Sequence, residues 1–345
     1  MKNKNFFKIN LIYFAAITLV AIIFVLGYLG LLQNEILTSF LIQIVVMFAI
    51  PMLMYSLLTK KSLKDTLNDT RLKKVTTNTI IISIGLGFVL YFINTFVADT
   101  FASIIAMFGY ETISSGASQT TITYGTLLKE LILSCILPGF CEEFLHRGIM
   151  LHANKKYSNP KFCLIISSIL FGLIHLNIRQ FFYAAILGFL MGYTTLIADS
   201  IVPSIIAHFM NNFLSTYFFY GSHFKWPLAT FVTEIRDFFY GNIMIFMISS
   251  TLCTVLLFLA YVKLTKLLQK ERIKKEINLI IKETQMEKLT IEEAQIKFEQ
   301  INQLLKHNTL THNQNRSSFF DKIFLISSIV LGTLITICSF LWGVI

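Results

Sequence analysis

The stretch LILSCILPGFCEEFLHRGIMLH, residues 131–152, is almost wholly apolar but contains the charged residues Glu142, Glu143 and Arg147. Its length is close to the ~20 helical residues that cross the hydrocarbon core of a bilayer. Ionised side chains at membrane depth are costly, and they persist mainly where a site uses them. The stretch therefore predicts a membrane-spanning helix that carries a buried reactive site.

The composition of the whole chain indicates a membrane protein. Hydrophobic residues make up 55% of the 345 residues and charged residues only 14%, whereas about a quarter of a soluble domain is charged. We predict an all-α, polytopic transmembrane helix bundle of about nine spans, with eight as the alternative. The apolar windows are 9–32, 37–58, 76–98, 131–152, 162–176, 181–198, 201–219, 238–262 and 323–345.

The basic residues predict how the chain lies in the cell membrane. They cluster at 2–8, 60–74, 155–161 and 263–275, which fall on one side of the membrane if all nine windows cross it. The loop 98–128 contains no lysine or arginine, as expected outside the cytoplasm. We therefore expect a cytoplasmic N-terminus and a non-cytoplasmic C-terminus. Orientation and contact with the lipid bilayer account for the net charge of +10, so we expect no nucleic-acid partner.

The same patterns divide the chain into five parts. Residues 264–321 are rich in charge of both signs, and Thr290 with Glu293 matches the capping box of an amphipathic helix on the cytoplasmic side, before the last span. Such a helix lies on the bilayer or on its own bundle, or offers a surface to a protein partner. The predicted parts are 1–122 (N-terminal transmembrane helices and a basic loop), 123–220 (core with the reactive site), 221–263 (an additional transmembrane helix), 264–321 and 322–345 (the last transmembrane helix).

Other apolar windows carry isolated polar residues at a matching depth. At ~1.5 Å per helical residue, Glu142 lies about 20 Å from the basic residue Lys155, and His175 lies about 21 Å from Lys161. His208 and Asn212 stand on a third helix, about 13 and 19 Å along it. We predict that three helices bring these groups to one site; the alternative is a set of ion pairs and hydrogen bonds that only join helices.

Helical spacing assigns separate roles to the two glutamates. Glu143 and Arg147 are four residues apart and face each other, while Glu142 is rotated by ~100° and stays free to act as a general base. His208 and Asn212 also share a helix face, from which both can donate hydrogen bonds to an oxyanion. His146 lies four residues after Glu142, where it either tunes that carboxylate or bonds to another helix.

These residues form three motifs in chain order, E-E-x-x-x-R at 142–147, F-x-x-x-H at 171–175 and H-x-x-x-N at 208–212. In this the chain resembles the CAAX-processing and bacteriocin-processing (CPBP or Abi) family of intramembrane proteases, which includes type II CAAX prenyl proteases. The resemblance implies an endopeptidase for a membrane-tethered peptide or protein, prenylated or bacteriocin-like. Glu142 with His175 would activate water, and His208 with Asn212 would stabilise the oxyanion. His146 departs from the aromatic residue that the family often has before the arginine.

The cofactor and the class of function keep alternatives open. The family is commonly labelled metalloprotease, and Glu142, His175 and His208 would supply a zinc site, but a metal-free mechanism uses the same residues. The sequence is therefore compatible with no cofactor or with one zinc ion. The rival to an enzyme is a noncatalytic immunity or maturation partner that binds peptides or another membrane protein. A proton-coupled transporter is disfavoured because the chain shows no internal repeat.

Overall fold

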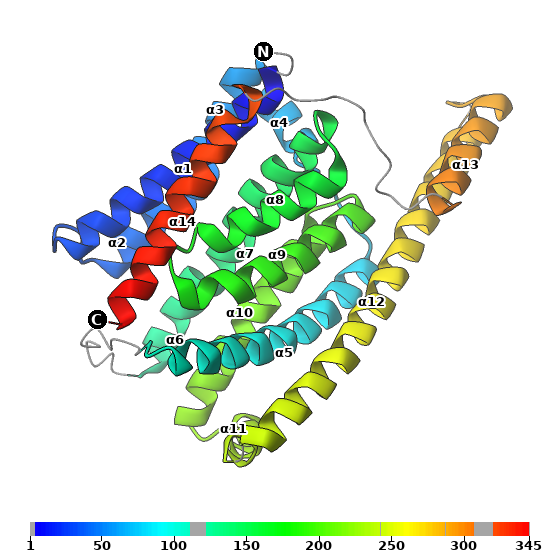
Figure 1. Cartoon of the computed structure of the whole chain (residues 1–345). Coiled ribbons are helices and arrows are strands. Elements are labelled where there is room, and N and C mark those ends of the chain that lie inside the picture. The colour runs from blue at the N-terminus through cyan, green and yellow to red at the C-terminus, as the bar shows by residue number, and fades with distance from the viewer. Residues whose placement is uncertain (1–3, 111–121, 242, 287, 307–319, 345) are drawn as a thin grey trace.

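The structure is a bundle of helices. The computed structural model describes residues 4–110, 122–241, 243–286, 288–306 and 320–344, and this part of the chain contains helices but no strand. The expectation of an all-α polytopic bundle is confirmed (Figure 1). The α-helices are α1 (Lys4–Tyr28), α2 (Glu35–Phe40), α3 (Ile50–Thr59), α4 (Leu63–Asp69), α5 (Thr77–Met107), α6 (Tyr124–Glu130), α7 (Leu137–Glu143), α8 (Pro160–Leu173), α9 (Ile178–Ala198), α10 (Val202–His223), α11 (Pro227–Tyr240), α12 (Ile243–Gln285), α13 (Ile291–Lys306) and α14 (Ile323–Val344).

Three segments between these helices are π-helical, and two are short 3-10 turns. The π-helices η1 (Leu41–Ala49), η2 (Leu131–Ile136) and η3 (Phe144–Ala153) join their neighbouring α-helices without a break, while η4 (Asn154–Lys156) and η5 (Phe320–Lys322) are 3-10 turns. As a result, α2, η1 and α3 form one long helix, and α6, η2, α7 and η3 form another.

Within the described residues, seven helices are long and apolar enough to cross a membrane, fewer than the nine windows. They are Lys4–Tyr28, Glu35–Thr59, Thr77–Met107, Tyr124–Ala153, Ile178–Ala198, Thr251–Gln285 and Phe320–Gly343. Window 162–176 becomes α8, whose 14 residues extend about 21 Å, less than the ~30 Å of hydrocarbon. Window 201–219 does form a helix, α10, but polar side chains such as His208, Asn211 and Asn212 lower its mean hydropathy.

Window 238–262 corresponds to parts of two helices. The first part lies in α11, and the rest lies in α12, a helix of 43 residues that extends from Ile243 into the charged region and ends at Gln285. The predicted amphipathic helix is present as α13, and Thr290 and Glu293 make the reciprocal hydrogen bonds of a capping box. Its apolar stripe packs on α12 itself, where Ala294, Phe298 and Ile301 meet Ile277 and Ile280. Figure 1 shows this hairpin extending beyond the other helices.

The first and last long helices lie side by side and run in the same direction. Near their starts the Phe7 and Phe324 rings are 4.9 Å apart, and near their ends the Tyr28 and Trp342 rings are 5.2 Å apart. The N and C labels in Figure 1 accordingly stand at opposite ends of this pair.

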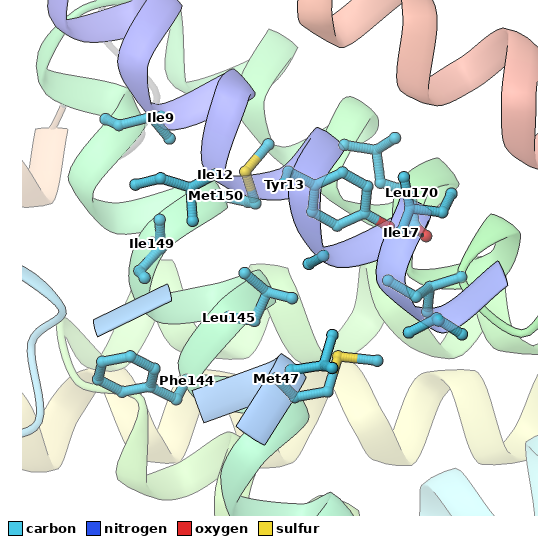
Figure 2. Packing of buried hydrophobic residues seen from close by; sticks show 14 of the residues in the cluster. Ile9, Ile12, Tyr13, Ile17, Met47, Phe144, Leu145, Ile149, Met150 and Leu170 are labelled. Carbon is cyan, nitrogen blue, oxygen red and sulfur yellow. Dashed lines mark hydrogen bonds between the residues drawn. The ribbon is translucent and has the colours of Figure 1, made fainter. Parts of the chain in front are cut away.

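Helix α1 also covers the helix that carries the glutamates. Figure 2 shows Ile9, Ile12 and Tyr13 of α1 packing towards Ile149 and Met150 of η3. The Tyr13 hydroxyl donates a 2.6 Å hydrogen bond to the Leu170 carbonyl of α8. All ten residues of η3 are buried, so the glutamates stand on a helix enclosed by its neighbours.

Candidate active site

The two glutamates are the last residues of α7, a short α-helix between two π-helical segments. Helix α7 ends at Glu143, with η2 before it and η3 after it. Pro138, whose ring nitrogen cannot donate a hydrogen bond, stands at the start of α7, where the wider π-helical hydrogen bonding of η2 ends. Departures from α-helical bonding inside a helix frequently mark functional sites.

Glu143 is the centre of a buried ionic cluster. Its Oε1 accepts hydrogen bonds from Arg147 Nη1 at 2.7 Å and from His208 Nδ1 at 2.9 Å, and the side chains of Glu143 and Arg147 are 0% and 1% exposed. Arg147 also donates to the Gly188 carbonyl at 3.3 Å, and its guanidinium carbon lies 4.2 Å from the centre of the Phe171 ring. The pair expected from the four-residue spacing is present, and the cluster joins the glutamate helix to α9 and α10.

Glu142 faces a different neighbour. Its Oε1 accepts a 2.8 Å hydrogen bond from Gln43 Nε2 of η1, and Gln43 is the one side chain of the described residues that bonds to this carboxylate. No cation pairs with Glu142 in this part of the chain, and the residue is 9% exposed. Two adjacent carboxylates thus have unlike surroundings, one held by an arginine and a histidine and the other by an amide.

The Phe171 ring lies among three imidazoles that come from three segments. The ring centroid is 5.0 Å from His146, 5.3 Å from His175 and 5.8 Å from His208, each in an edge-on arrangement. Phe171 therefore fixes the relative positions of the glutamate helix, the end of α8 and α10. The sequence motif contains this residue, but its central place results from packing that the sequence does not reveal.

His175 lies just beyond the end of α8 rather than within a span. Helix α8 ends at Leu173, and Leu176 takes a left-handed conformation with φ 51°. His175 Nδ1 lies 2.8 Å from the Phe171 carbonyl. Because a carbonyl only accepts, Nδ1 donates this hydrogen bond, and Nε2 is left for another partner.

The side-chain amide of Asn212 makes two hydrogen bonds with neighbouring residues. Its Nδ2 donates to the Ser134 carbonyl of η2 at 2.9 Å, and its Oδ1 accepts from Asn211 Nδ2 at 2.8 Å. An amide nitrogen has two hydrogens, so one remains for another acceptor.

His146 bonds within its own helix. Its Nδ1 lies 2.8 Å from the Glu142 main-chain carbonyl, and its Nε2 is buried without a hydrogen-bond partner among the described residues. The ring packs edge-on against Tyr13 and Phe171. His146 therefore touches the backbone of Glu142, while the bond to another helix that we considered is not found in this part of the structure.

The residues proposed as zinc ligands are not arranged as a metal site. Across the described ranges, no group of three or more His, Cys, Asp or Glu side chains is placed to hold a metal ion. The hydrogen bonds of His208 Nδ1 to Glu143 and of His175 Nδ1 to a carbonyl leave both Nε2 atoms for other partners, so they do not themselves argue against a metal; the spacing of the side chains does. The set Glu142, His175 and His208 as placed here does not fit a zinc ion.

Gln43 is the site residue that the motifs miss. It is a single amide in the otherwise apolar run 41–50, and it is buried beside Glu142. A polar residue at this depth is the kind of signal that pointed to Glu142 itself. Its partner lies 99 positions further along the chain, which spacing alone cannot reveal.

Comparison with protein families supports the resemblance. Residues 124–214 match the family described as type II CAAX prenyl endopeptidase Rce1-like. The chain is similar to that family over this segment, about a quarter of its length. The matched CAAX endopeptidase segment contains both glutamates, Arg147, His175, His208 and Asn212, whereas Gln43 and Tyr13 lie before it. No curated protein and no solved structure matches the chain.

Proposed function

We propose that this chain is an intramembrane endopeptidase in which Glu142 activates water to hydrolyse a peptide bond of a membrane-associated substrate. The family segment supports a membrane protease in general. The observation that carries the catalytic role is the difference between the two glutamates. Glu143 is held by Arg147 and His208, and its second oxygen is buried, while Glu142 bonds to a neutral amide and keeps a second oxygen that is not buried, where a water molecule can bind.

The reaction begins with attack by water on the substrate carbonyl. Glu142 removes one proton as the water oxygen bonds to the carbonyl carbon, and His175 Nε2 accepts a hydrogen bond that orients the water. The carbonyl oxygen becomes an oxyanion. When the carbon–nitrogen bond breaks, the leaving amine takes the proton back from Glu142, so atoms and charge balance.

His208 and Asn212 are the proposed oxyanion donors. Because His208 Nδ1 donates to Glu143, its Nε2 can donate to the oxyanion only if the ring carries a proton on both nitrogens, and the scheme requires that form. Asn212 contributes the amide hydrogen that Ser134 does not use. In this scheme Glu143 and Arg147 hold His208 in place, and Gly188 anchors the arginine.

The chain is proposed to cross the cell membrane with its N-terminus in the cytoplasm and its C-terminus outside. The parallel course of α1 and α14 supports opposite sides for the two termini. Lys73 and Lys155 gather around Asp199 at one end of the bundle, as expected of a cytoplasmic face. A protein partner for 264–321 is a separate proposal. The apolar stripe of α13 packs on α12 and is therefore not available to such a partner.

The test uses purified protein in liposomes with a quenched fluorescent peptide that ends in a farnesylated CAAX sequence. We expect cleavage by the natural chain and a loss of at least 100-fold in Glu142→Gln, which keeps the size of the side chain. Glu130→Gln, on the same long helix, is the control and should keep full activity. Full cleavage by Glu142→Gln would overturn the proposal.

The rival function, a noncatalytic peptide-binding partner, predicts a different pattern. Such a protein would bind the farnesylated peptide without cleaving it, and Glu142→Gln would leave binding unchanged. Comparing the farnesylated with the unmodified peptide shows in addition whether prenylation determines the substrate class.

A further inference from the structure

Gln43 presents a buried acceptor that the surrounding chain does not use. The residue is 8% exposed, and its amide nitrogen donates to Glu142 Oε1. Its amide oxygen is buried and has no hydrogen-bond partner among the described residues. A buried polar atom that is left unpaired is unfavourable, so such an atom calls for a partner.

The orientation of this amide follows from its neighbour. A carboxylate has no hydrogen to donate, so the amide nitrogen must face Glu142 and the amide oxygen must point away from that bond. The ring contacts of Phe48 with Phe140 and Phe144 fix η1 against the glutamate helix. The position of Gln43 is therefore determined by packing as well as by its hydrogen bond.

The two amide atoms share one carbon, so Gln43 Oε1 lies within about 5 Å of the Glu142 carboxylate, a span that one water molecule bridges. A water that attacks a carbonyl has two hydrogens, and each needs an acceptor if the lone pair is to be aimed at the carbon. Glu142 accepts one hydrogen, and the other can be shared between His175 Nε2 and Gln43 Oε1 in a three-centre hydrogen bond.

We propose that Gln43 is a positioning residue that, together with Glu142, holds the hydrolytic water, an inference that rests on the proposed function. Gln43 neither gains nor loses a proton in the reaction; it sets the direction of the attacking oxygen. Because it precedes the matched family segment, the first part of the chain completes the site.

The first experiment compares Gln43→Leu with Asn10→Leu in the liposome assay. Asn10 is a matched control, since it is also a buried amide with unpartnered polar atoms, on α1. We expect Gln43→Leu to lower kcat by 10- to 100-fold with KM within twofold, and Asn10→Leu to keep kcat within twofold. Thermal unfolding of both variants shows whether they fold. A kcat within threefold of the natural chain for a folded Gln43→Leu would overturn the proposal.

A second experiment separates water positioning from a purely structural tie between helices. In Gln43→Ala, added acetamide supplies the missing donor and acceptor, whereas isobutene, which has the same shape, supplies neither. We expect acetamide, and not isobutene, to raise kcat of Gln43→Ala at least fivefold, with no effect on Asn10→Ala. Equal rescue by both compounds, or no rescue, contradicts the proposed role.

These variants separate the role of Gln43 from the proposed endopeptidase function on which it rests. If Glu142→Gln is inactive while Gln43→Leu is fully active, only the role of Gln43 fails. If Glu142→Gln cleaves the peptide normally, the proposed function fails and the role of Gln43 fails with it.

Discussion

The Glu143 carboxylate lies 2.7 Å from the Arg147 guanidinium, and neither side chain is more than 1% exposed. His208 shares the same carboxylate oxygen. Because these side chains are buried, the charges of Glu143 and Arg147 depend on each other for their stabilisation. The cluster therefore holds three segments of the bundle together and also fixes the histidine that faces the proposed reaction.

Replacing Arg147 with Met should destabilise the protein by about 3–5 kcal/mol, because it leaves a buried carboxylate without its cation. Thermal unfolding in detergent measures the loss. The exposed Arg179→Met serves as the control and should change little. The double variant Glu143→Gln with Arg147→Met should regain part of the stability, and no regain would contradict the ionic explanation.

Replacing Gly172 with Ala should separate α8 from α9. A methyl group there would lie 2.6 Å from the Phe181 carbonyl oxygen, which belongs to the backbone and cannot move aside cheaply. We expect a loss of about 1–3 kcal/mol together with reduced cleavage, since Phe171 is the adjacent residue. Gly27→Ala, whose nearest neighbour would be 3.6 Å away, should keep normal stability and activity.

The stability of the protein should rise with pH above neutrality because of Lys155. Burial lowers its pKa from 10.5 to about 8, and the charges of Arg71 and Arg272 act in the same direction against that of Asp199. Between these two values the unfolded chain holds a proton that the folded chain has lost, so stability increases as pH rises.

Unfolding midpoints measured in steps from pH 7 to 10.5 check this expectation. Lys155→Gln should remove most of the rise over that range. An identical slope in the natural chain and in Lys155→Gln would show that another group is responsible.

Chelators should leave the rate of peptide cleavage within twofold of that of the untreated protein, because the side chains of the described residues are not grouped as a metal site. Incubation with 1,10-phenanthroline, followed by the peptide assay, tests this expectation. Elemental analysis of the active protein should find less than a tenth of an equivalent of zinc. Inactivation that added zinc reverses would instead support the metal mechanism through Glu142, His175 and His208.

Local spacing predicts the parts of the site that lie on one helix. The four-residue separation of Glu143 and Arg147 led directly to their ion pair, and the rotation between adjacent residues turned Glu142 to another neighbour. Neither argument needs knowledge of the fold. The identity of the partners on other helices, Gln43 and the Phe171 ring, depends on packing between distant segments and could not be obtained in this way.

The ends of helices were predicted less well than their existence. The apolar window continues through Leu176, but the left-handed turn at that residue ends the helical run and places His175 outside it. The window at 238–262 ended where charge begins, yet helical hydrogen bonding does not stop at charged residues, and α12 continues to Gln285. Hydropathy reports the solvent around a segment, whereas helix length is decided by capping and packing.

The pairing of α1 with α14 places the first and the last long helices of the chain against each other. During synthesis, α1 enters the membrane long before its partner exists, and until then the face that α14 will cover is in contact with lipid or with a chaperone. Contacts between such distant parts of a chain close late in folding. The contact between α1 and α14 can therefore form only after α14 has been inserted, and a chain that lacks α14 leaves this face of α1 uncovered.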